Sequence, residues 1–313
     1  MIDLSDIEAA QQRIEGKVRR TPIMQAGPMR EPAVADAELW LKLECQQISG
    51  SFKARGATNM VTCLDEAKFA KGLVTASGGN HGSGVAYAGW RAGAPVRVFL
   101  PEDTPQAKYD LLAAWDAEVV THGKVWDDAN AAALAAAEAD GLTYVHPFAD
   151  DLVVAGQGTL GLEIFGQLPH LDVLVVAIGG GGLIAGVAVA VKALSPETRI
   201  IGVEPTGAPT LQACVKAGGL VSLDKISTQV GVLAALTTDQ TVLDIVTDFV
   251  EDIVLVSDDD MLAASRWLWR EFGVAAELGG AAATAALLNG KISNIVGKHV
   301  CSLICGAGRD GIG

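Results

Sequence analysis

Short runs of hydrophobic residues alternate along the chain with longer, alanine-rich stretches that have helical spacing. Runs rich in valine and isoleucine predict β-strands at residues 73–77, 96–100, 118–122, 172–178 and 199–204. Helical patterns lie between them, at residues 82–92, 106–114, 126–140 and 183–194. Strands that alternate with helices are typical of βαβ units with a parallel sheet. The pattern therefore predicts an α/β fold, with ligands at the carboxyl ends of the strands.

Two further segments of this pattern need interpretation. Ser5 followed by Glu8 has the spacing of a capping box, which predicts that an amphipathic helix begins there. The window 173–191 has no charged residue and is long enough to cross a bilayer, but four consecutive glycines at 179–182 interrupt it. We therefore expect this window to form a strand covered on both faces, a turn and a helix.

Composition and charge narrow the class of protein. Half of the 313 residues are hydrophobic and 19% are charged, which allows a sizeable core and excludes a disordered chain. The formal net charge of −14 disfavours nucleic acid and membrane surfaces as partners. Five cysteines without a CxxC pair, together with an acidic N-terminal segment that does not read as a signal peptide, predict a cytoplasmic protein.

The first candidate for chemistry is Lys53, in the segment SGSFKARGA (49–57). Glycine and serine predict a turn, and Lys53 then lies near the start of a helix that runs through Asn59. The positive end of a helix dipole lowers the pKa of an ammonium group and so favours the neutral amine that forms an imine. An ordinary surface lysine at a helix start has the same local sequence, so this segment alone does not fix the role of Lys53.

Two glycine-rich turns each follow a predicted strand and precede a predicted helix. They are SGGNHG (77–82) and GGGGLIAG (179–186). Backbone N–H groups at such a turn point outward and bind a carboxylate or a phosphate. Asn80 adds an amide that can hold an oxygen of a ligand. An ordinary turn with an asparagine cap accounts for residues 77–82 equally well, whereas the run of four glycines predicts an anion site.

The second turn also fits a dinucleotide-binding fingerprint. Gly180, Gly182 and Ala185 satisfy G-x-G-x-x-G/A, and Glu204 ends the next predicted strand. On this turn alone, an NAD-dependent dehydrogenase that uses the loop from Gly180 to Ala185 is an open alternative.

Taken together, these segments resemble the fold-type II pyridoxal-phosphate enzymes, in particular the serine/threonine dehydratase and serine racemase group. The resemblance covers nearly the whole chain and includes RTPI (20–23), LKLE (41–44), SGSFKARGA, SGGNHG, GGGG, GVEP (202–205) and ICGAG (304–308). It implies the tryptophan synthase β-like fold, with two open, twisted, mostly parallel sheets and flanking helices. Residues 1–69 plus 146–313 would form a large cofactor-binding domain, and residues 70–145 a small inserted domain. A homodimer is expected.

The resemblance also implies roles for individual residues. Lys53 would carry pyridoxal 5'-phosphate as a Schiff base and take the α-proton of the substrate. Phe52 would pack near the cofactor ring, Asn80 would bond its 3-oxygen, and Cys305 would face its pyridine nitrogen. Because a thiol is a weak donor and acceptor, that nitrogen would stay neutral; a small buried hydrophobe is the alternative role for this cysteine. The phosphate would be bound by Gly179, Gly180, Gly181, Gly182 and Leu183, and the substrate carboxylate by Ser77, Gly78, Gly79, Asn80, His81 and Gly82.

The implied reaction is the dehydration of a 3-hydroxy amino acid of the serine or threonine type to a 2-oxo acid and ammonia. Racemases of this group carry a serine where this chain has Gly78, so we expect weak or absent racemisation. A non-catalytic binding module on the same scaffold would not need the imine nitrogen of Lys53.

The sequence does not identify the β-substituent of the substrate. Trp126 and the segment STQVGVLAAL (227–236) are candidates for the pocket, and Val230, Val232 and Leu233 favour an apolar substituent.

A divalent cation, Mg or Ca, is the remaining open point. Relatives bind one with residues that match Glu204 and Ala208, but this chain has Thr210 where they have an aspartate, which weakens the ligand set. Glu277 matches a glutamate near the cofactor in relatives, although its surrounding motif differs.

Overall fold

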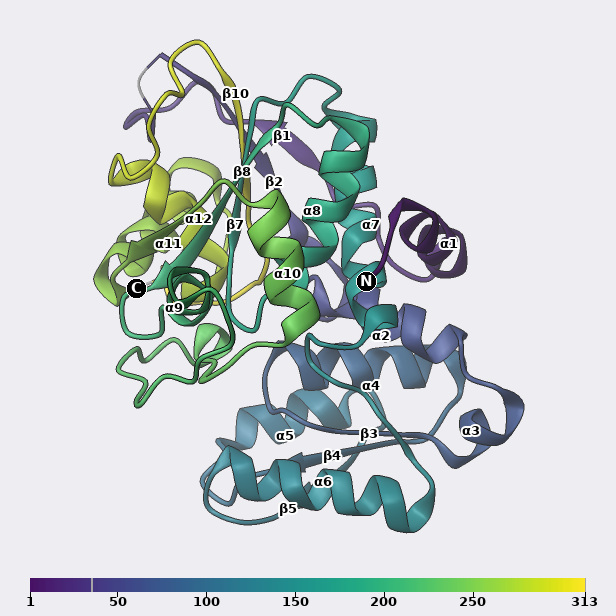
Figure 1. Cartoon of the computed structure of the whole chain (residues 1–313). Helices are drawn as coiled ribbons and strands as arrows, with labels where there is room; N and C mark the ends of the chain where they lie inside the picture. Colours follow the sequence, from purple (N-terminus) through teal and green to yellow (C-terminus); the bar gives the residue numbers. More distant parts are fainter. Residues whose placement is uncertain (35, 313) are drawn as a thin grey trace.

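The computed structural model describes residues 1–34 and 36–312 and contains two sheets, drawn in Figure 1. The strands are β1 (Ile23–Gln25), β2 (Glu38–Lys42), β3 (Leu73–Ala76), β4 (Val96–Leu100), β5 (Glu118–Thr121), β6 (Thr143–Tyr144), β7 (Val173–Ala177), β8 (Arg199–Pro205), β9 (Asp252–Val256) and β10 (His299–Leu303). The larger sheet has the order β1-β2-β10-β7-β8-β9 and the smaller one β5-β4-β3-β6. The β1–β2 pair is antiparallel and the other pairs are parallel. The predicted α/β fold with two mostly parallel sheets is confirmed.

Helices flank both sheets. They are α1 (Leu4–Ile14), α2 (Lys53–Thr62), α3 (Glu66–Lys71), α4 (Asn80–Ala92), α5 (Gln106–Ala113), α6 (Trp126–Asp140), α7 (Asp151–Gln167), α8 (Gly182–Leu194), α9 (Thr210–Ala217), α10 (Gln240–Phe249), α11 (Asp258–Phe272) and α12 (Leu278–Leu288), with the short 3-10 helices η1 (Glu44–Gln46), η2 (Ile48–Gly50) and η3 (Gly231–Leu233). Each helix and strand predicted from the hydrophobic pattern is present, with its ends within two residues of the prediction.

The predicted cap of the first helix is wrong. The N-cap residue of α1 is Asp3, whose carboxylate accepts hydrogen bonds from the backbone N–H groups of Ser5 and Asp6. Asp6 completes the capping box by accepting from the N–H of Asp3 at 3.0 Å. Aspartate is as good an N-cap as serine, and the helix can begin earlier when Asp3 takes this position. The hydroxyl of Ser5 instead donates to Asp3.

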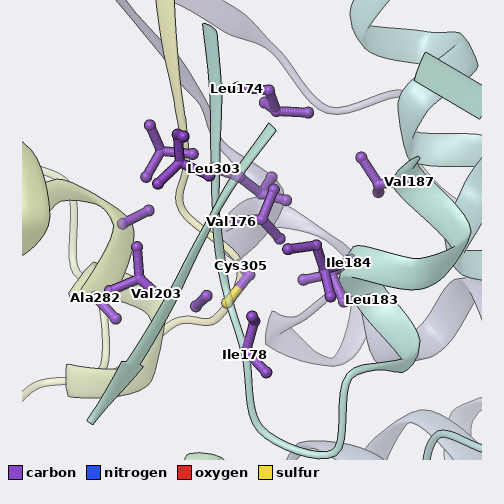
Figure 2. Close-up of a cluster of buried hydrophobic side chains, with 14 of the residues drawn as sticks. Leu174, Val176, Ile178, Leu183, Ile184, Val187, Val203, Ala282, Leu303 and Cys305 are labelled. Atoms are coloured by element: carbon purple, nitrogen blue, oxygen red, sulfur yellow. The ribbon is translucent and has the colours of Figure 1, made fainter. Parts of the chain in front are cut away.

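The apolar window at 173–191 forms a buried strand, a glycine turn and the helix α8, as predicted. All residues of β7 are buried because helices cover both faces of the larger sheet. Figure 2 shows Ile184 and Val187 of α8 on one side of the central strands and Ala282 of α12 on the other. Within the described part of the chain, no helix has the length and apolar character needed to span a membrane.

The two sheets lie in different parts of the molecule, the smaller one at the bottom of Figure 1. The smaller sheet consists of the consecutive strands β3 to β6, whereas the larger sheet combines strands from both ends of the chain. Helices α2 and α4 pack on each other between the two sheets. The domain limits 1–69 plus 146–313 and 70–145 stay a prediction, and Ala35 and Gly313 lie outside the described residues.

Candidate active site

Lys53 is the first residue of α2, and Phe52 precedes it as an N-cap that makes no side-chain capping bond. The Lys53 Nζ donates a hydrogen bond to the carbonyl oxygen of Pro147 at 2.5 Å and lies 5.1 Å from the centre of the Phe52 ring. Burial lowers the pKa of Lys53 to about 8. The predicted direction of the shift agrees with this value, but its main cause is desolvation rather than the helix dipole. The neutral amine is therefore a larger share of Lys53 near physiological pH than of an ordinary lysine, although the ammonium form still predominates.

Cys305 lies close to Lys53, two residues after the end of the central strand β10. The backbone N–H of Phe52 donates to the Cys305 carbonyl at 3.2 Å, which ties the start of α2 to this cysteine. The Cys305 Sγ is buried and donates to the carbonyl of Gly279 at 3.7 Å. Burial raises the pKa of this thiol, so it is neutral. Figure 2 draws Cys305 among the apolar side chains of the central strands and α8, with Ile178, Val203 and Ile184 around it.

Asn80 is the first residue of α4 and bonds to a residue at the start of α12. Gly79 is the N-cap of this helix, and no side chain in the described part of the protein caps it. The Asn80 Nδ2 donates a hydrogen bond to Oε1 of Glu277, the residue that precedes α12. Burial raises the pKa of Glu277 to about 7. Glu277, which the altered motif made a minor candidate, therefore orients a predicted cofactor ligand.

The rest of the SGGNHG turn is fixed by its own geometry. A Cβ atom on Gly82 would lie 1.8 Å from the carbonyl oxygen of Ser77, so only glycine fits there. The Ser77 Oγ accepts from the N–H of Gly79 at 3.2 Å. His81 is buried with its Nε2 2.9 Å from the Val145 carbonyl oxygen, and desolvation lowers its pKa to about 3. This histidine is therefore neutral and does not supply positive charge to the turn.

The four glycines after β7 lie between segments that are distant in sequence. A Cβ on Gly180 would lie 2.1 Å from the ring of Phe148, and one on Gly182 would lie 2.5 Å from the Phe148 carbonyl. Gly181 has a φ of +92° and is the N-cap of α8, which no side chain of the described residues caps. Close packing thus requires these glycines, and the turn leaves the first N–H groups of α8 without a side-chain partner. Thr238 holds the turn by donating from Oγ1 to the Gly180 carbonyl at 3.0 Å.

Two contacts at the site were not expected from the sequence. The carbonyl of Pro147 accepts from Lys53, and the ring of Phe148 packs on the glycine turn. Both residues follow β6 in the segment HPF (146–148), at the carboxyl end of a strand. That position was a usable signal, because ligands of such folds gather at strand carboxyl ends.

Trp126, a candidate pocket residue, is the first residue of α6 and is 47% exposed. Its Nε1 donates to the carbonyl of Ala76 at 2.8 Å. Ala76 ends β3 directly before the SGGNHG turn, so Trp126 braces the strand end that carries this turn.

Glu204 makes contacts of a different kind. Its buried carboxylate accepts from the backbone N–H groups of Leu211 at 2.7 Å and Gln212 at 2.9 Å, at the start of α9. Burial raises its pKa to about 7. No group of three or more histidine, cysteine, aspartate or glutamate side chains that could hold a metal occurs among residues 1–34 and 36–312. A cation at Glu204 and Ala208 stays a prediction.

Comparison with known proteins places this geometry in context. The family model for pyridoxal-phosphate dependent enzymes matches residues 14–306. An L-threonine ammonia-lyase of Geobacter sulfurreducens is 39% identical over 303 residues, which are 97% of this chain and 75% of that protein. The solved structure of a threonine deaminase from T.th. matches with a TM-score of 0.90 at 35% identity over 98% of each chain. Maize serine racemase also matches with a TM-score of 0.90, at 31% identity, over 97% of this chain and 93% of that one.

Proposed function

The chain belongs to the family of pyridoxal-phosphate dependent enzymes, and from this membership we propose that it is an ammonia-lyase acting on a 3-hydroxy amino acid of the threonine type. The products would be a 2-oxo acid and ammonia. The observation that carries the proposal is the desolvated amine of Lys53, bonded to a backbone carbonyl and placed beside a neutral thiol. The similarity to threonine ammonia-lyases over nearly the whole chain supports the choice of reaction.

The residues of the site fit pyridoxal phosphate. The uncapped start of α8 offers N–H groups to a phosphate, and Lys53 offers an amine of lowered pKa to an aldehyde. Ser51 Oγ, His81 Nδ1 and Ser83 Oγ, on the two segments around Lys53, are buried and lack a partner among the described residues, as expected where a polar ligand belongs. We infer that the phosphate is held by Gly179, Gly180, Gly181, Gly182 and Leu183, and the ring by Phe52, Asn80 and Cys305.

Each side chain then has a definite task. When bound, the cofactor withdraws electrons from the substrate α-carbon and makes its proton acidic. The Lys53 amine takes that proton, and its lowered pKa increases the share of neutral amine that can accept it. The uncapped start of α4, with Ser77 to Gly82 before and within it, binds and orients the substrate carboxylate. Glu277 fixes the amide of Asn80.

Cys305 affects which reactions the site can support. Its thiol is buried and neutral, so it does not supply a proton to the ring nitrogen in the way that a carboxylic acid would. A weaker electron sink suits an elimination in which the hydroxyl leaves as the α-proton is removed. It suits transamination poorly, because that reaction needs a long-lived carbanion.

The alternatives account for less of the site. A racemase needs an acid or base on the second face of the substrate, and Gly78 has no side chain; a Cβ there would face Leu100 at 3.2 Å and Thr104 at 3.5 Å. A dehydrogenase that uses the Gly180 to Ala185 loop leaves Lys53 and the SGGNHG turn without a role. A non-catalytic binding module leaves Lys53 without a role.

We also propose that the enzyme works in the cytoplasm as a homodimer, with a free amino acid as its small-molecule partner. Five free cysteines support a reducing compartment, and the family resemblance supports the dimer. A bound Mg or Ca ion at Glu204 and Ala208 would have to replace the bonds of the Glu204 carboxylate to Leu211 and Gln212.

The first test compares the native protein with Lys53→Ala. The native protein should show an absorbance band near the visible edge that shifts with L-threonine or L-serine, and it should release 2-oxo acid. Lys53→Ala should lose the band and slow the reaction by about 10²-fold or more. Lys71→Ala, on the exposed end of α3, is the matched control and should behave as the native protein does.

Two results would contradict the proposal. A native protein without a band, even after pyridoxal phosphate is added, would remove the role of Lys53. Chiral analysis of the L-serine reaction should give little D-serine; rapid formation of D-serine without 2-oxo acid would favour the racemase.

A further inference from the structure

The apolar side chains of the segment 227–236 differ in exposure: Val232 and Leu236 are exposed, whereas Val230 and Leu233 are buried. Val230 is 5% exposed and Leu233 is 6% exposed, so both belong to the core. Val232, on η3 between them, is 43% exposed. Exposed valines are common on protein surfaces, so exposure by itself assigns no role to Val232. Its neighbours decide the matter.

Val232 lies where the glycine segments of the site meet. A Cβ on Gly79, in the SGGNHG turn, would lie 3.8 Å from Val232 Cγ1, and a Cβ on Gly279, in α12, would lie 2.5 Å from Val232 Cγ2. The Val232 carbonyl oxygen lies 3.0 Å from the Cβ position of Gly179, the first glycine of the phosphate-binding turn. Val232 therefore borders the substrate-carboxylate turn and the phosphate-binding turn at once.

The segment that carries Val232 is fixed on both sides. Before it, Thr228 Oγ1 donates to Asp258 at 2.5 Å, and the N–H of Gln229 donates to the same carboxylate at 2.7 Å. After it, Thr210 Oγ1 donates to the carbonyl of Ala235 at 2.5 Å. The burial of Val230 and Leu233 adds apolar anchors. These contacts hold Val232 in one position, and a fixed wall discriminates between substrates better than a mobile one.

We propose that Val232 is the specificity-determining residue and forms the wall against which the β-substituent of the substrate packs. This inference rests on the proposed function. In the proposed function the SGGNHG turn binds the carboxylate and Lys53 faces the α-carbon, and Val232, which borders Gly79 of that turn, is then placed to meet the β-substituent. The substrate class is 3-hydroxy amino acids with an apolar β-substituent, such as threonine or phenylserine.

The chemistry of the wall explains the preference. The methyl group of threonine, packed against Val232, removes apolar surface of both groups from water, and serine lacks that group. A difference of one methyl group in an apolar pocket is worth about 10-fold or more in kcat/KM. The second carboxylate of 3-hydroxyaspartate would lose hydration against the same wall without gaining a polar partner from Val232.

The test measures the ratio of kcat/KM for L-threonine to kcat/KM for L-serine in the holoenzyme. Val232→Thr, which replaces a methyl with a hydroxyl at constant shape, should lower this ratio several-fold. Val232→Asp should lower it by about 10-fold or more, because a carboxylate would face the substrate methyl group. Val215→Asp, on the exposed side of α9 at 40% exposure, is the matched control and should leave the ratio within about twofold of the native value.

The outcomes separate this inference from the proposed function. If the native protein binds pyridoxal phosphate and acts on 3-hydroxy amino acids, but both Val232 variants keep the native ratio with an unchanged absorbance band, the wall lies elsewhere and the inference is wrong. If the native protein has no such activity, the proposed function fails first. A lowered ratio with an unchanged band, in both variants but not in Val215→Asp, supports the inference.

Discussion

Two neighbouring units of the larger sheet, β7–α8 and β8–α9, have the same local architecture and use it in opposite ways. In each, a parallel strand is followed by a turn and a helix. The turn before α8 consists of glycines, and no side chain of the described residues caps that helix. The start of α9 instead receives the Glu204 carboxylate, which accepts from the N–H groups of Leu211 and Gln212.

The two helix starts differ in whether a side chain of the described residues accepts from their first N–H groups, and we propose that the start without such an acceptor is the one that binds a ligand. Both helix starts attract negative charge, since the first N–H groups of any helix lack intrahelical partners. At α9 the carboxyl group of Glu204, on the preceding strand, accepts from these N–H groups. At α8 no side chain of the described residues accepts from these N–H groups, which supports the proposal that a cofactor phosphate binds there.

The largest expected effect comes from a substitution that obstructs the glycine turn at the start of α8. Gly182→Ala would place a Cβ 2.5 Å from the Phe148 carbonyl, so the backbone of the turn must move. Overpacking of this kind costs about 1–3 kcal/mol, and we expect a loss of roughly tenfold to a hundredfold in affinity for pyridoxal phosphate. Titration of the cofactor-free protein, followed by absorbance, measures this loss. Gly219→Ala, where a Cβ meets nothing within 4 Å, is the control; equal affinity in the two variants would refute the argument.

A somewhat smaller effect should follow from replacing the carboxyl group of Glu204 at the start of α9. The folded-state pKa of Glu204 is about 7 against an ordinary value of 4.5, because burial disfavours the carboxylate. The folded protein therefore holds this proton more tightly than the unfolded chain does. The resulting stabilisation is complete below about pH 4.5 and is lost as the pH rises through about 7.

Glu204→Gln removes that titration. The free energy of unfolding of the native protein, relative to this variant, should fall by about 2 kcal/mol between pH 5 and pH 8. Urea unfolding of both proteins at the two pH values measures the difference. A difference that stays constant or grows with pH would show that the carboxylate is stabilised in its ionised form by the N–H groups of α9.

The smallest expected effect is the stabilisation of the cofactor-free protein by a simple anion. About 10 mM inorganic phosphate should stabilise the cofactor-free native protein by about 1 kcal/mol through the start of α8, which corresponds to a rise of a few degrees in Tm. Sodium chloride at equal ionic strength is the control for screening. Gly182→Ala should lose this rise. An equal rise in that variant would place the phosphate at another site.

The sequence predicted the turn between β7 and α8 better than the capping of α9, for a physical reason. Four consecutive glycines between a strand and a helix restrict what the backbone can do, so Gly179 to Gly182 could be recognised as a turn that admits a ligand. Glu204 ended a predicted strand in a motif shared with relatives, and a cation ligand was one interpretation. The capping of α9 depends on how the chain turns back after Pro205, and its local sequence does not encode that.

For Lys53, Asn80 and Val232 too, the local sequence predicted one part of the role and contacts with distant segments decided the rest. The sequence placed Lys53 near a helix start, but its burial and its bond to Pro147 come from packing against a segment 94 residues away. Asn80 was a predicted ligand, whereas its partner Glu277 is 197 residues away and was only a minor candidate. Val232 was one of several apolar residues in a loop, and its exposure beside Gly79 became visible only in the folded chain.

The sequence by itself determined the alternation of strands and helices, the glycine turns and the position of the lysine at the start of a helix. Each of these depends on backbone preferences and hydrophobic spacing over a few neighbouring residues. The tertiary structure decided which helix starts stay free, which amine is desolvated and which side chain borders the substrate turn. Those properties depend on contacts between segments that are far apart in the chain, since burial and electrostatics are set by all the atoms around a group rather than by its neighbours in sequence.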